Sequence, residues 1–358
     1  PPCTMYSSTS GGVDEGEDME IPIRSLETYA YLETRPGGCV EVSPGHVTIH
    51  PSLHRHAAAK EFAIRAHTPE TKPELVTGVA GFVLDTLLSG HAVTVVAMGP
   101  PGTGKSSLLW LPEGILDVVL AGLYAHCEGE GAEGLLTVGV SCFELGDQSI
   151  YDLLTPERSE VPPSAPAVMC VHGPDEMTAR QLVQYSHSLS DNWTDDRVRS
   201  GRYLPSPGHS HSFVRVSLHD SDNDTLATAH LIEVLPSLPP ASERDTQREA
   251  PPAYAQTHSL SLSTALRSMG DHPGSVPTGR DTVLSRLVVP LLSQAAGALI
   301  VTGNDSLPTS TGNVLELAGR AKGIYAPLIP IAARRDQLCF VAPSDVLQAG
   351  EEEREGEG

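Results

Sequence analysis

The sequence predicts a three-layer α/β domain in which helices cover both faces of a central, mostly parallel sheet. The first observation is the stretch VVAMGPPGTGKSSLLW, residues 95–110, where a buried apolar run leads directly into a glycine-rich loop and a helix start. The second is an alternation of short apolar runs with helical patterns around that stretch. With 358 residues, 39% of them hydrophobic, the chain is long enough to bury a substantial core.

The alternating pattern defines the expected elements in chain order. The apolar and periodic segments predict a strand at 29–34, a helix at 74–90, a strand at 92–98, a helix at 113–126, and strands at 135–145, 211–220 and 228–236. The last two strands form an antiparallel pair around the polar turn SDNDT. The Pro-rich stretches 155–167 and 236–257 are expected to be mobile loops. In such an arrangement a nucleotide binds at the carboxyl ends of the strands.

The glycine-rich loop has the spacing GxxxxGK[ST], which is typical of a phosphate-binding loop. Glycine lets the backbone turn its N–H groups inward around a polyphosphate, and the helix that follows adds unpaired N–H groups and a positive dipole end. Lys105 is expected to neutralise the β and γ phosphates, and the Ser106 hydroxyl to ligate Mg²⁺. The loop therefore predicts binding of ATP with Mg²⁺ by Gly99, Pro100, Pro101, Gly102, Thr103, Gly104, Lys105, Ser106 and Ser107.

Charge and composition limit the partners. The net charge of −22 opposes binding to nucleic acid or to an anionic membrane surface. The six cysteines show no CxxC pair, so neither a zinc site nor a disulfide framework is indicated. No apolar run reaches the roughly 18 residues of a membrane span, and no signal peptide is recognised. We therefore expect a cytoplasmic protein without a membrane span.

The order of the remaining motifs resembles the kinesin motor domain from about residue 27 to 326. YAYLETRP resembles the family's first strand, whose RxRP end brackets adenine; Arg35 and Pro36 match it, whereas Glu33 stands where the first arginine is expected. Three further segments are similar to family motifs in the same order: CFELGDQSIYDLL (142–154), VPTGRDTVLSRLVVPLL (276–292) and LELAGRAKGI (315–324). The resemblance implies an acidic disordered segment at 1–26, a motor-like domain at 27–326, and a neck-like segment with an acidic disordered tail at 327–358.

The first nucleotide-sensing switch of the family, NxxSSRSH, is only partly matched. The stretch LPSPGHSHS keeps Ser210 and His211, which the resemblance makes catalytic candidates. It has Pro207, Gly208 and His209 where Ser, Ser and Arg are expected. A shift of one residue would bring Ser206 to the metal instead. The same letters also fit a loop that simply feeds a strand.

The second switch, DxxGxE, is altered at each of its three fixed positions. EVLPSL places Glu233, the third catalytic candidate, at the aspartate, Pro236 at the glycine and Leu238 at the glutamate. Because proline has no N–H, Pro236 lacks the hydrogen bond that reports the γ-phosphate. The Arg/Glu pair between the switches is missing on both sides. The resemblance thus implies an ATP hydrolase of motor type with weak turnover, if it is active.

Two groups of conspicuous side chains are expected to be structural. Trp110 and Trp193 are interpreted as packing residues. Glu144 and Asp152 form a candidate carboxylate pair, and the family resemblance makes them structural as well.

The resemblance implies microtubules as the partner of this domain, and charge predicts that the binding is weak. Between residues 236 and 292 the arginines at 244, 248, 267, 280 and 286 are balanced by acids at 243, 245, 249, 271 and 281, with no lysine. One alternative is a non-motile, nucleotide-gated scaffold on the same fold. Another is an AAA-like ATPase, since GPPGTGKS alone is most similar to that class. The oligomeric state and direction of movement stay open.

Overall fold

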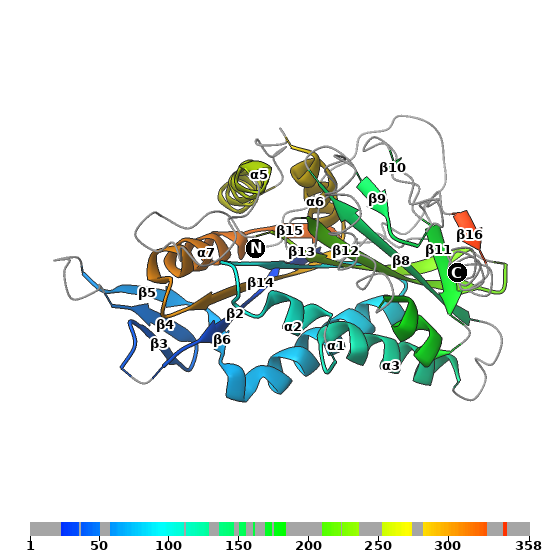
Figure 1. Cartoon of the computed structure of the whole chain (residues 1–358), viewed down its shortest axis with the longest axis horizontal. Coiled ribbons are helices and arrows are strands. Elements are labelled where there is room, and N and C mark those ends of the chain that lie inside the picture. Colours follow the sequence, from blue (N-terminus) through cyan, green and yellow to red (C-terminus); the bar gives the residue numbers. More distant parts are fainter. Residues whose placement is uncertain are drawn as a thin grey trace, which may run out of the picture.

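The computed structural model describes residues 23–35, 37–50, 58–110, 112–128, 136–146, 150–154, 160–161, 169–173, 175–183, 210–222, 224–235, 253–273, 282–327 and 339–341. The described residues form three layers, with helices on both faces of a twisted sheet (Figure 1). One face carries α1 (Lys72–Leu88), α2 (Lys105–Leu109) and α3 (Ile115–Cys127). The other carries α5 (Ala253–Asp271), α6 (Val283–Gln294) and α7 (Pro308–Ala321). The predicted three-layer α/β class is confirmed.

The central sheet is mixed. Its strands follow the order β10-β9-β8-β12-β13-β7-β14-β2-β6, and β11 joins β8 and β16 beside this path. From β13 to β6 every neighbouring pair is parallel, whereas from β13 to β10 every pair is antiparallel. The bounds are β2 (Glu27–Glu33), β6 (Arg65–His67), β7 (Ala92–Met98), β8 (Leu136–Leu145), β9 (Ile150–Asp152), β10 (Glu160–Val161), β11 (Met169–Gly173), β12 (His211–Asp220), β13 (Thr225–Glu233), β14 (Ala296–Asn304) and β16 (Cys339–Val341).

The described residues also include two small sheets, a short 3-10 helix and a helical segment at 176–183. The strands β3 (Val40–Ser43), β4 (His46–Ile49) and β5 (Lys60–Ala63) form an antiparallel sheet at one end of the molecule (Figure 1). The strand β1 (Ile23–Ser25) pairs antiparallel with β15 (Tyr325–Pro327). The 3-10 helix η1 (Pro69–Thr71) leads into α1.

The strand β7 lies inside the parallel half, between β13 and β14, and all seven of its residues are buried. Successive side chains of a strand point to opposite faces, so both faces of β7 need an apolar cover. Val93, Val95 and Ala97 pack in the core formed with α1 and α3. Val96 and Met98 pack in the core formed with α5, α6 and α7. The sheet thus separates two hydrophobic cores, and β7 contributes to both.

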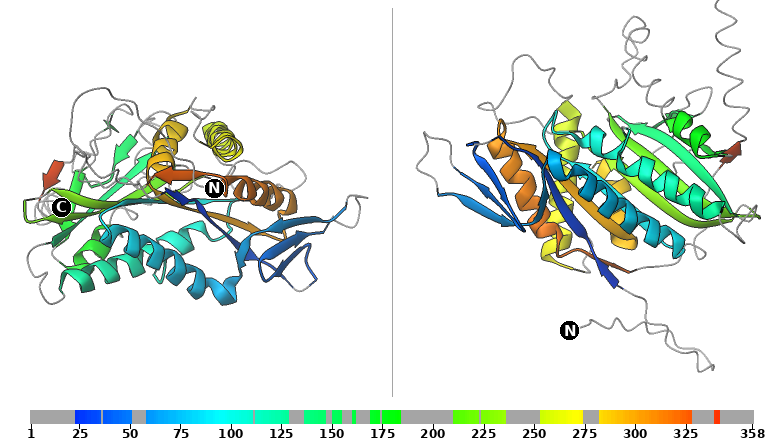
Figure 2. Two further views of the ribbon diagram at one scale, coloured as in Figure 1. Left: turned by 180° about the vertical axis from the view of Figure 1, so that it is seen from behind. Right: turned by 90° about the horizontal axis from the view of Figure 1, so that it is seen from below.

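The helices α1 and α3 lie side by side on one face of the sheet (Figure 2). Gly122 of α3 permits this close approach, because a Cβ at that position would lie 2.5 Å from Cδ1 of Leu84 in α1. The packed pair covers the same face of the sheet as α2, the helix that follows the glycine-rich loop.

Several predicted boundaries agree with the structure and others need correction. The strands predicted at 92–98 and 211–220 are found with those bounds. Residues 253–257, predicted to be loop, begin α5 instead, and this helix buries Ala255, His258 and Leu262. Ile23–Ser25, predicted to be disordered, form β1 because β15 supplies their hydrogen-bonding partner. The remaining residues of this predicted loop, 236–252, and residues 1–22 lie outside the described residues.

Candidate functional site

The carboxyl ends of four parallel strands meet at one edge of the sheet. In register, Glu33 at the end of β2 faces Asn304 of β14, Val301 of β14 faces Met98 of β7, and Glu233 of β13 faces Ala97 of β7. The glycine-rich loop at 99–104 follows β7 directly, so it lies at the middle of this edge. This is where open α/β sheets bind ligands.

The glycine-rich loop has a shape that requires glycine at two positions, because a side chain there would clash with neighbouring residues. A Cβ at Gly99 would lie 2.1 Å from Oγ1 of Thr302 and 2.4 Å from its carbonyl oxygen, so only glycine lets the loop pass β14 here. Gly104 has a φ of 84°, which is a left-handed conformation, and a Cβ at this position would crowd the ring of Tyr31. The backbone therefore bends tightly before the start of α2.

A threonine pair holds the loop in this shape. The hydroxyl of Thr103 donates to the carbonyl of Pro100 at 2.8 Å and lies 2.5 Å from the hydroxyl of Thr302 on β14. Both threonines are fully buried. No local pattern in the sequence marks Thr302, because the approach of β14 to the loop depends on strand order.

The side chain of Lys105 is folded back onto the loop. It is 5% exposed, and its Nζ donates to the carbonyls of Gly99 at 3.1 Å and Pro100 at 2.9 Å. Burial lowers the pKa of Lys105 to about 8, and the nearby negative charge of Glu233 partly offsets this effect. The loop thus contains a buried amine that needs an anionic partner to hold its charge firmly.

The carboxylate of Glu233 is held between two donors of the loop helix. Oε1 accepts the hydroxyl of Ser106 at 2.9 Å, and Oε2 accepts the indole N–H of Trp110 at 2.8 Å. Ser106 is exposed while Trp110 is buried. The predicted metal ligand Ser106 and the predicted catalytic acid Glu233 therefore lie in direct contact. Trp110, predicted to be a packing residue, is also a hydrogen-bond donor to this acid.

Two other predicted nucleotide-binding positions, Ser107 and Arg35, contact α1 and the segment after β14. Ser107 accepts the Nζ of Lys72, from the first turn of α1, at 2.8 Å. The backbone N–H of Arg35 donates to Asp305 at 2.5 Å, and Val40 N–H donates to the same carboxylate at 2.8 Å. Asp305 thus ties the segment after β2 to the end of β14. Pro36 lies outside the described residues, and nothing local in the sequence marked Lys72 or Asp305.

The first-switch candidates lie at the start of β12. His211 is fully buried; its Nδ1 accepts the backbone N–H of Leu235 at 3.0 Å, and its Nε2 lies 3.1 Å from Nδ1 of His258 in α5. Burial, and secondly the neighbouring His258, lower the pKa of His211 well below its usual value, so the ring is neutral. Ser210 is buried, and its hydroxyl has no hydrogen-bond partner among the described residues.

The structure thus groups Lys105, Ser106 and Glu233 at the loop, whereas both ring nitrogens of His211 are engaged away from it. The altered switch positions 207–209, 236 and 238 lie outside the described residues. Of the predicted structural carboxylates, Asp152 is buried and accepts the N–H of Leu154 at 2.9 Å. Within the described ranges, no cluster of three metal-ligating side chains is found and no helix is long and apolar enough to cross a membrane.

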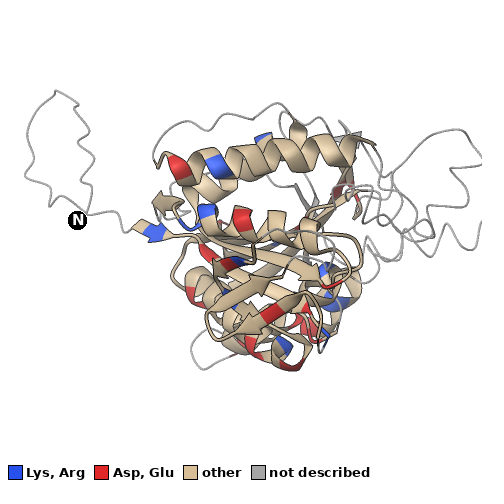
Figure 3. Cartoon of the chain, turned by 90° about the vertical axis from the view of Figure 1, so that its left-hand side faces the viewer, with Lys and Arg blue, Asp and Glu red and all other residues tan. Residues whose placement is uncertain are grey.

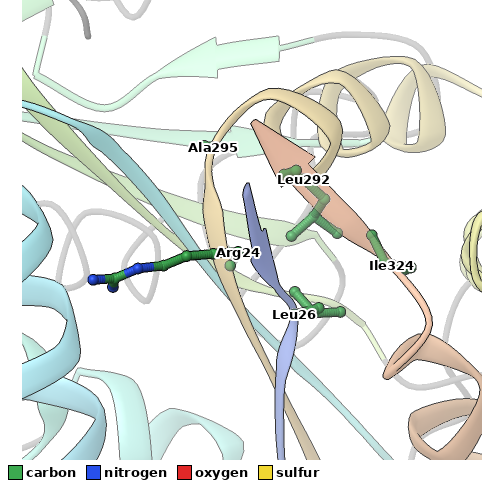
Figure 4. A pocket seen from close by; sticks show the side chains of 7 residues that line it. Arg24, Leu26, Leu292, Ala295 and Ile324 are labelled. Atoms are coloured by element: carbon green, nitrogen blue, oxygen red, sulfur yellow. The ribbon is translucent and has the colours of Figure 1, made fainter. Parts of the chain in front are cut away.

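A small depression lies at the opposite end of β14 from the loop. Leu26, Leu292 and Ile324 line it together with Arg24, Ala295, Gly297 and Ala326 (Figure 4). The labelled side chain of Arg24 points away from the apolar ones. Because Gly297 stands near the amino end of β14, this depression is separate from the nucleotide edge.

The fold and the loop define an α/β protein of the P-loop class. The family profile of the kinesin motor domain matches residues 46–324, which is more than half of the chain. The chain therefore belongs to the kinesin motor domain family, and the AAA-like alternative is set aside. The matched range falls within the 27–326 span predicted from the resemblance.

Similar proteins agree with this assignment. The chain is 22% identical over 310 residues to the kinesin-like protein KIN-8A of Arabidopsis thaliana; the alignment covers 82% of this chain but 41% of that relative. It therefore spans less than half the length of this relative. Among solved structures, a KIF14 dimer in a two-heads-bound state, with AMP-PNP and in complex with a microtubule, matches with a TM-score of 0.67 and 15% identity. That match covers 86% of this chain and 96% of the other, and it shows a common fold.

Proposed function

We propose that this domain binds MgATP and MgADP at the loop 99–107 and acts as a kinesin-type motor domain on microtubules, with slow hydrolysis. The observation that carries the proposal is the contact between Ser106 and Glu233 beside the buried Lys105. It combines the three chemical functions that a metal-nucleotide site needs: a cation for the phosphates, a hydroxyl for the metal and an acid behind that hydroxyl.

The residues present fit a magnesium nucleotide. Burial depresses the pKa of the Lys105 amine, the charge of Glu233 only partly offsets this, and a polyphosphate would add negative charge beside the amine. Ser106 is exposed, and its hydroxyl donates a hydrogen bond to Glu233. The lone pairs of the hydroxyl oxygen are therefore available to a cation. When bound, MgATP supplies the γ-phosphoryl group together with the positive charge that stabilises its transfer to water. Ser106 would hold the metal, and Lys105 the phosphates.

Slow hydrolysis follows from the switch residues. Pro236 stands at the position whose N–H senses the γ-phosphate in the family pattern, and proline has no N–H to donate. Leu238 and His209 replace the Glu and Arg that pair between the switches. Loss of one donor to a transition state commonly costs a factor of ~10² to 10³ in rate. For His211 we propose a positioning role, because both of its ring nitrogens are already bonded.

Steady-state ATP hydrolysis by the full chain, with and without microtubules, tests the proposal. We expect a rate well below the ~1 to 100 s⁻¹ typical of kinases, with nucleotide binding lost in Lys105→Ala. The combined change Pro236→Gly, His209→Arg and Leu238→Glu should raise the rate. A fast wild-type rate would contradict the assignment of the switches. Calorimetry showing no binding of either nucleotide would refute the nucleotide site itself.

The second candidate is a non-motile scaffold on the same fold that binds nucleotide without useful turnover. The missing N–H at Pro236 favours this scaffold, because the loop would still bind the nucleotide while no N–H at this position senses the γ-phosphate. Nucleotide binding without any microtubule-stimulated turnover, even in the restored variant, would support the scaffold over the motor.

A further inference from the structure

Trp110 follows the last residue of α2 and is 9% exposed. Its backbone N–H donates to the carbonyl of Ser106 at 2.8 Å, which places residues 106 and 110 one helical turn apart on the same side. Their side chains donate to the two oxygens of a single carboxylate, that of Glu233. The acid is thus fixed at both oxygens by one short stretch of the loop helix.

Both carboxylate oxygens of the glutamate side chain take part in this arrangement. The resembled switch pattern has aspartate at this position, whose side chain is one methylene shorter. The extra methylene gives Glu233 one more rotatable bond and therefore more orientations to lose when its carboxylate is ordered. An indole N–H is a donor only, and a hydrogen bond to an ionised group is among the stronger ones, so Trp110 restricts the carboxylate to one orientation.

We propose that Trp110 is a positioning residue of the metal site: by holding Oε2 of Glu233 it aims Oε1 at the Ser106 hydroxyl and so orients that hydroxyl toward Mg²⁺. This inference rests on the proposed nucleotide function and deepens it. Trp110 and Glu233 form a matched pair, in which the tryptophan compensates for the greater freedom of the longer acid. Groups that orient a metal ligand from behind commonly affect metal affinity by 10- to 100-fold when removed.

The hydrogen bond is tested first in the protein without nucleotide. The chain has two tryptophans, so Trp193→Phe leaves Trp110 as the only indole. In that background the ¹⁵N-labelled indole N–H resonance should shift clearly in Glu233→Ala. An unchanged resonance would overturn the contact on which the proposal stands.

The positioning role is tested by the magnesium dependence of ADP binding, followed by calorimetry. Trp110→Phe keeps a large aromatic ring but removes the donor, and we expect it to raise the half-saturating Mg²⁺ concentration about tenfold. ADP affinity in excess chelator should stay within about twofold of wild type, since Lys105 and the loop backbone are untouched. Trp193→Phe is the matched control and should change neither quantity.

A purely structural role for Trp110 would lower ADP affinity equally with and without Mg²⁺, and that result would overturn the proposal. An unchanged magnesium dependence in Trp110→Phe would overturn it as well while leaving the proposed function intact. If the wild type binds no nucleotide at any Mg²⁺ concentration, the proposed function fails and the positioning role fails with it.

The pairing of Trp110 with Glu233 predicts one further result. Glu233→Asp shortens the acid, so its carboxylate no longer spans both donors, and the magnesium dependence should weaken. Adding Trp110→Phe to this variant should cause little further loss, because the contact is already broken. Fully additive losses would show that Trp110 acts without Glu233 and would overturn the pairing. Thermal unfolding of each variant shows whether the fold is retained.

Discussion

Lys105 should take up a proton when MgADP binds at mildly alkaline pH. In the free protein, burial lowers its pKa to about 8, so near that pH the amine is charged in only part of the molecules. Phosphate groups next to the amine favour the charged form and raise its pKa. The bound state then holds more protons than the free state, and by linkage nucleotide affinity falls as pH rises through the free pKa.

The size of the effect follows from this one value. With a free pKa of about 8, binding takes up ~0.5 proton at pH 8 and almost none at pH 6.5, where the free amine is already charged. If the charged amine is required for tight binding, the apparent affinity falls about tenfold between pH 7 and pH 9. A lysine with its ordinary pKa would show neither effect in this range.

Calorimetry in buffers of different ionisation enthalpy measures the uptake directly. Lys105→Arg should abolish it, because guanidinium stays protonated throughout. Lys72→Gln serves as the matched control, since Lys72 is the lysine that contacts Ser107 at the same loop. Absence of uptake at pH 8 would refute the reasoning. Uptake that persists in Lys105→Arg, or disappears in Lys72→Gln, would assign the proton to another group.

Two further outcomes are expected. His258→Phe removes the buried partner of His211 Nε2, so the free energy of unfolding measured with urea should fall by about 1 to 3 kcal/mol; an unchanged value would show that the pair contributes nothing. Co-sedimentation of the full chain should give weak microtubule binding at physiological salt and no gain at low salt, where the repulsion between the acidic chain (net charge −22) and an acidic surface is screened less, with a further loss in Arg286→Glu. Tight, salt-insensitive binding unaffected by that charge reversal would contradict the electrostatic argument.

Charged residues are sparse on the described helices of the expected microtubule-binding segment. On α5 and α6 the charged residues are Arg267, Asp271 and Arg286. Asp271 lies 3.5 Å from Arg320 of α7, which also pairs with Glu316. Basic and acidic residues are interspersed on the side of the molecule shown in Figure 3. The remaining charges between residues 236 and 292 lie outside the described ranges, so the expected weak attachment stays a prediction.

The phosphate loop was predictable because its geometry is encoded within a few consecutive residues. The requirement for glycine at 99 and 104, the lysine and the hydroxyl all belong to one strand, loop and helix start. The strand at 92–98 was equally clear, since a strand buried on both faces is a continuous apolar run. In these places local sequence and tertiary position favour the same conformation.

The elements that sequence missed depend on partners far away in the chain. The strand β1 has only three residues, all exposed, and it exists because β15 lies beside it some 300 residues later. The first turn of α5 follows two prolines and was assigned to a loop, whereas its burial of Ala255 and His258 comes from tertiary packing. The contact of Trp110 with Glu233 needs β13 to lie next to β7, which no local pattern reveals.

The backbone of Leu235 links the nucleotide edge of the sheet to α5 without any help from the altered switch residues. Its N–H donates to Nδ1 of His211, so the ring proton is on Nε2 and points to His258 in α5. Its carbonyl accepts the hydroxyl of Ser259 in the same helix at 2.9 Å. A shift of this segment must therefore break or carry along one direct contact with α5, at Ser259, and one that reaches α5 through His211. If Pro236 stands at the sensing position, as proposed above, it lacks the N–H that would report the γ-phosphate, but the contacts of Leu235 one residue earlier do not depend on that N–H. A domain that reads the γ-phosphate poorly would still pass any movement of the strand end to this helix.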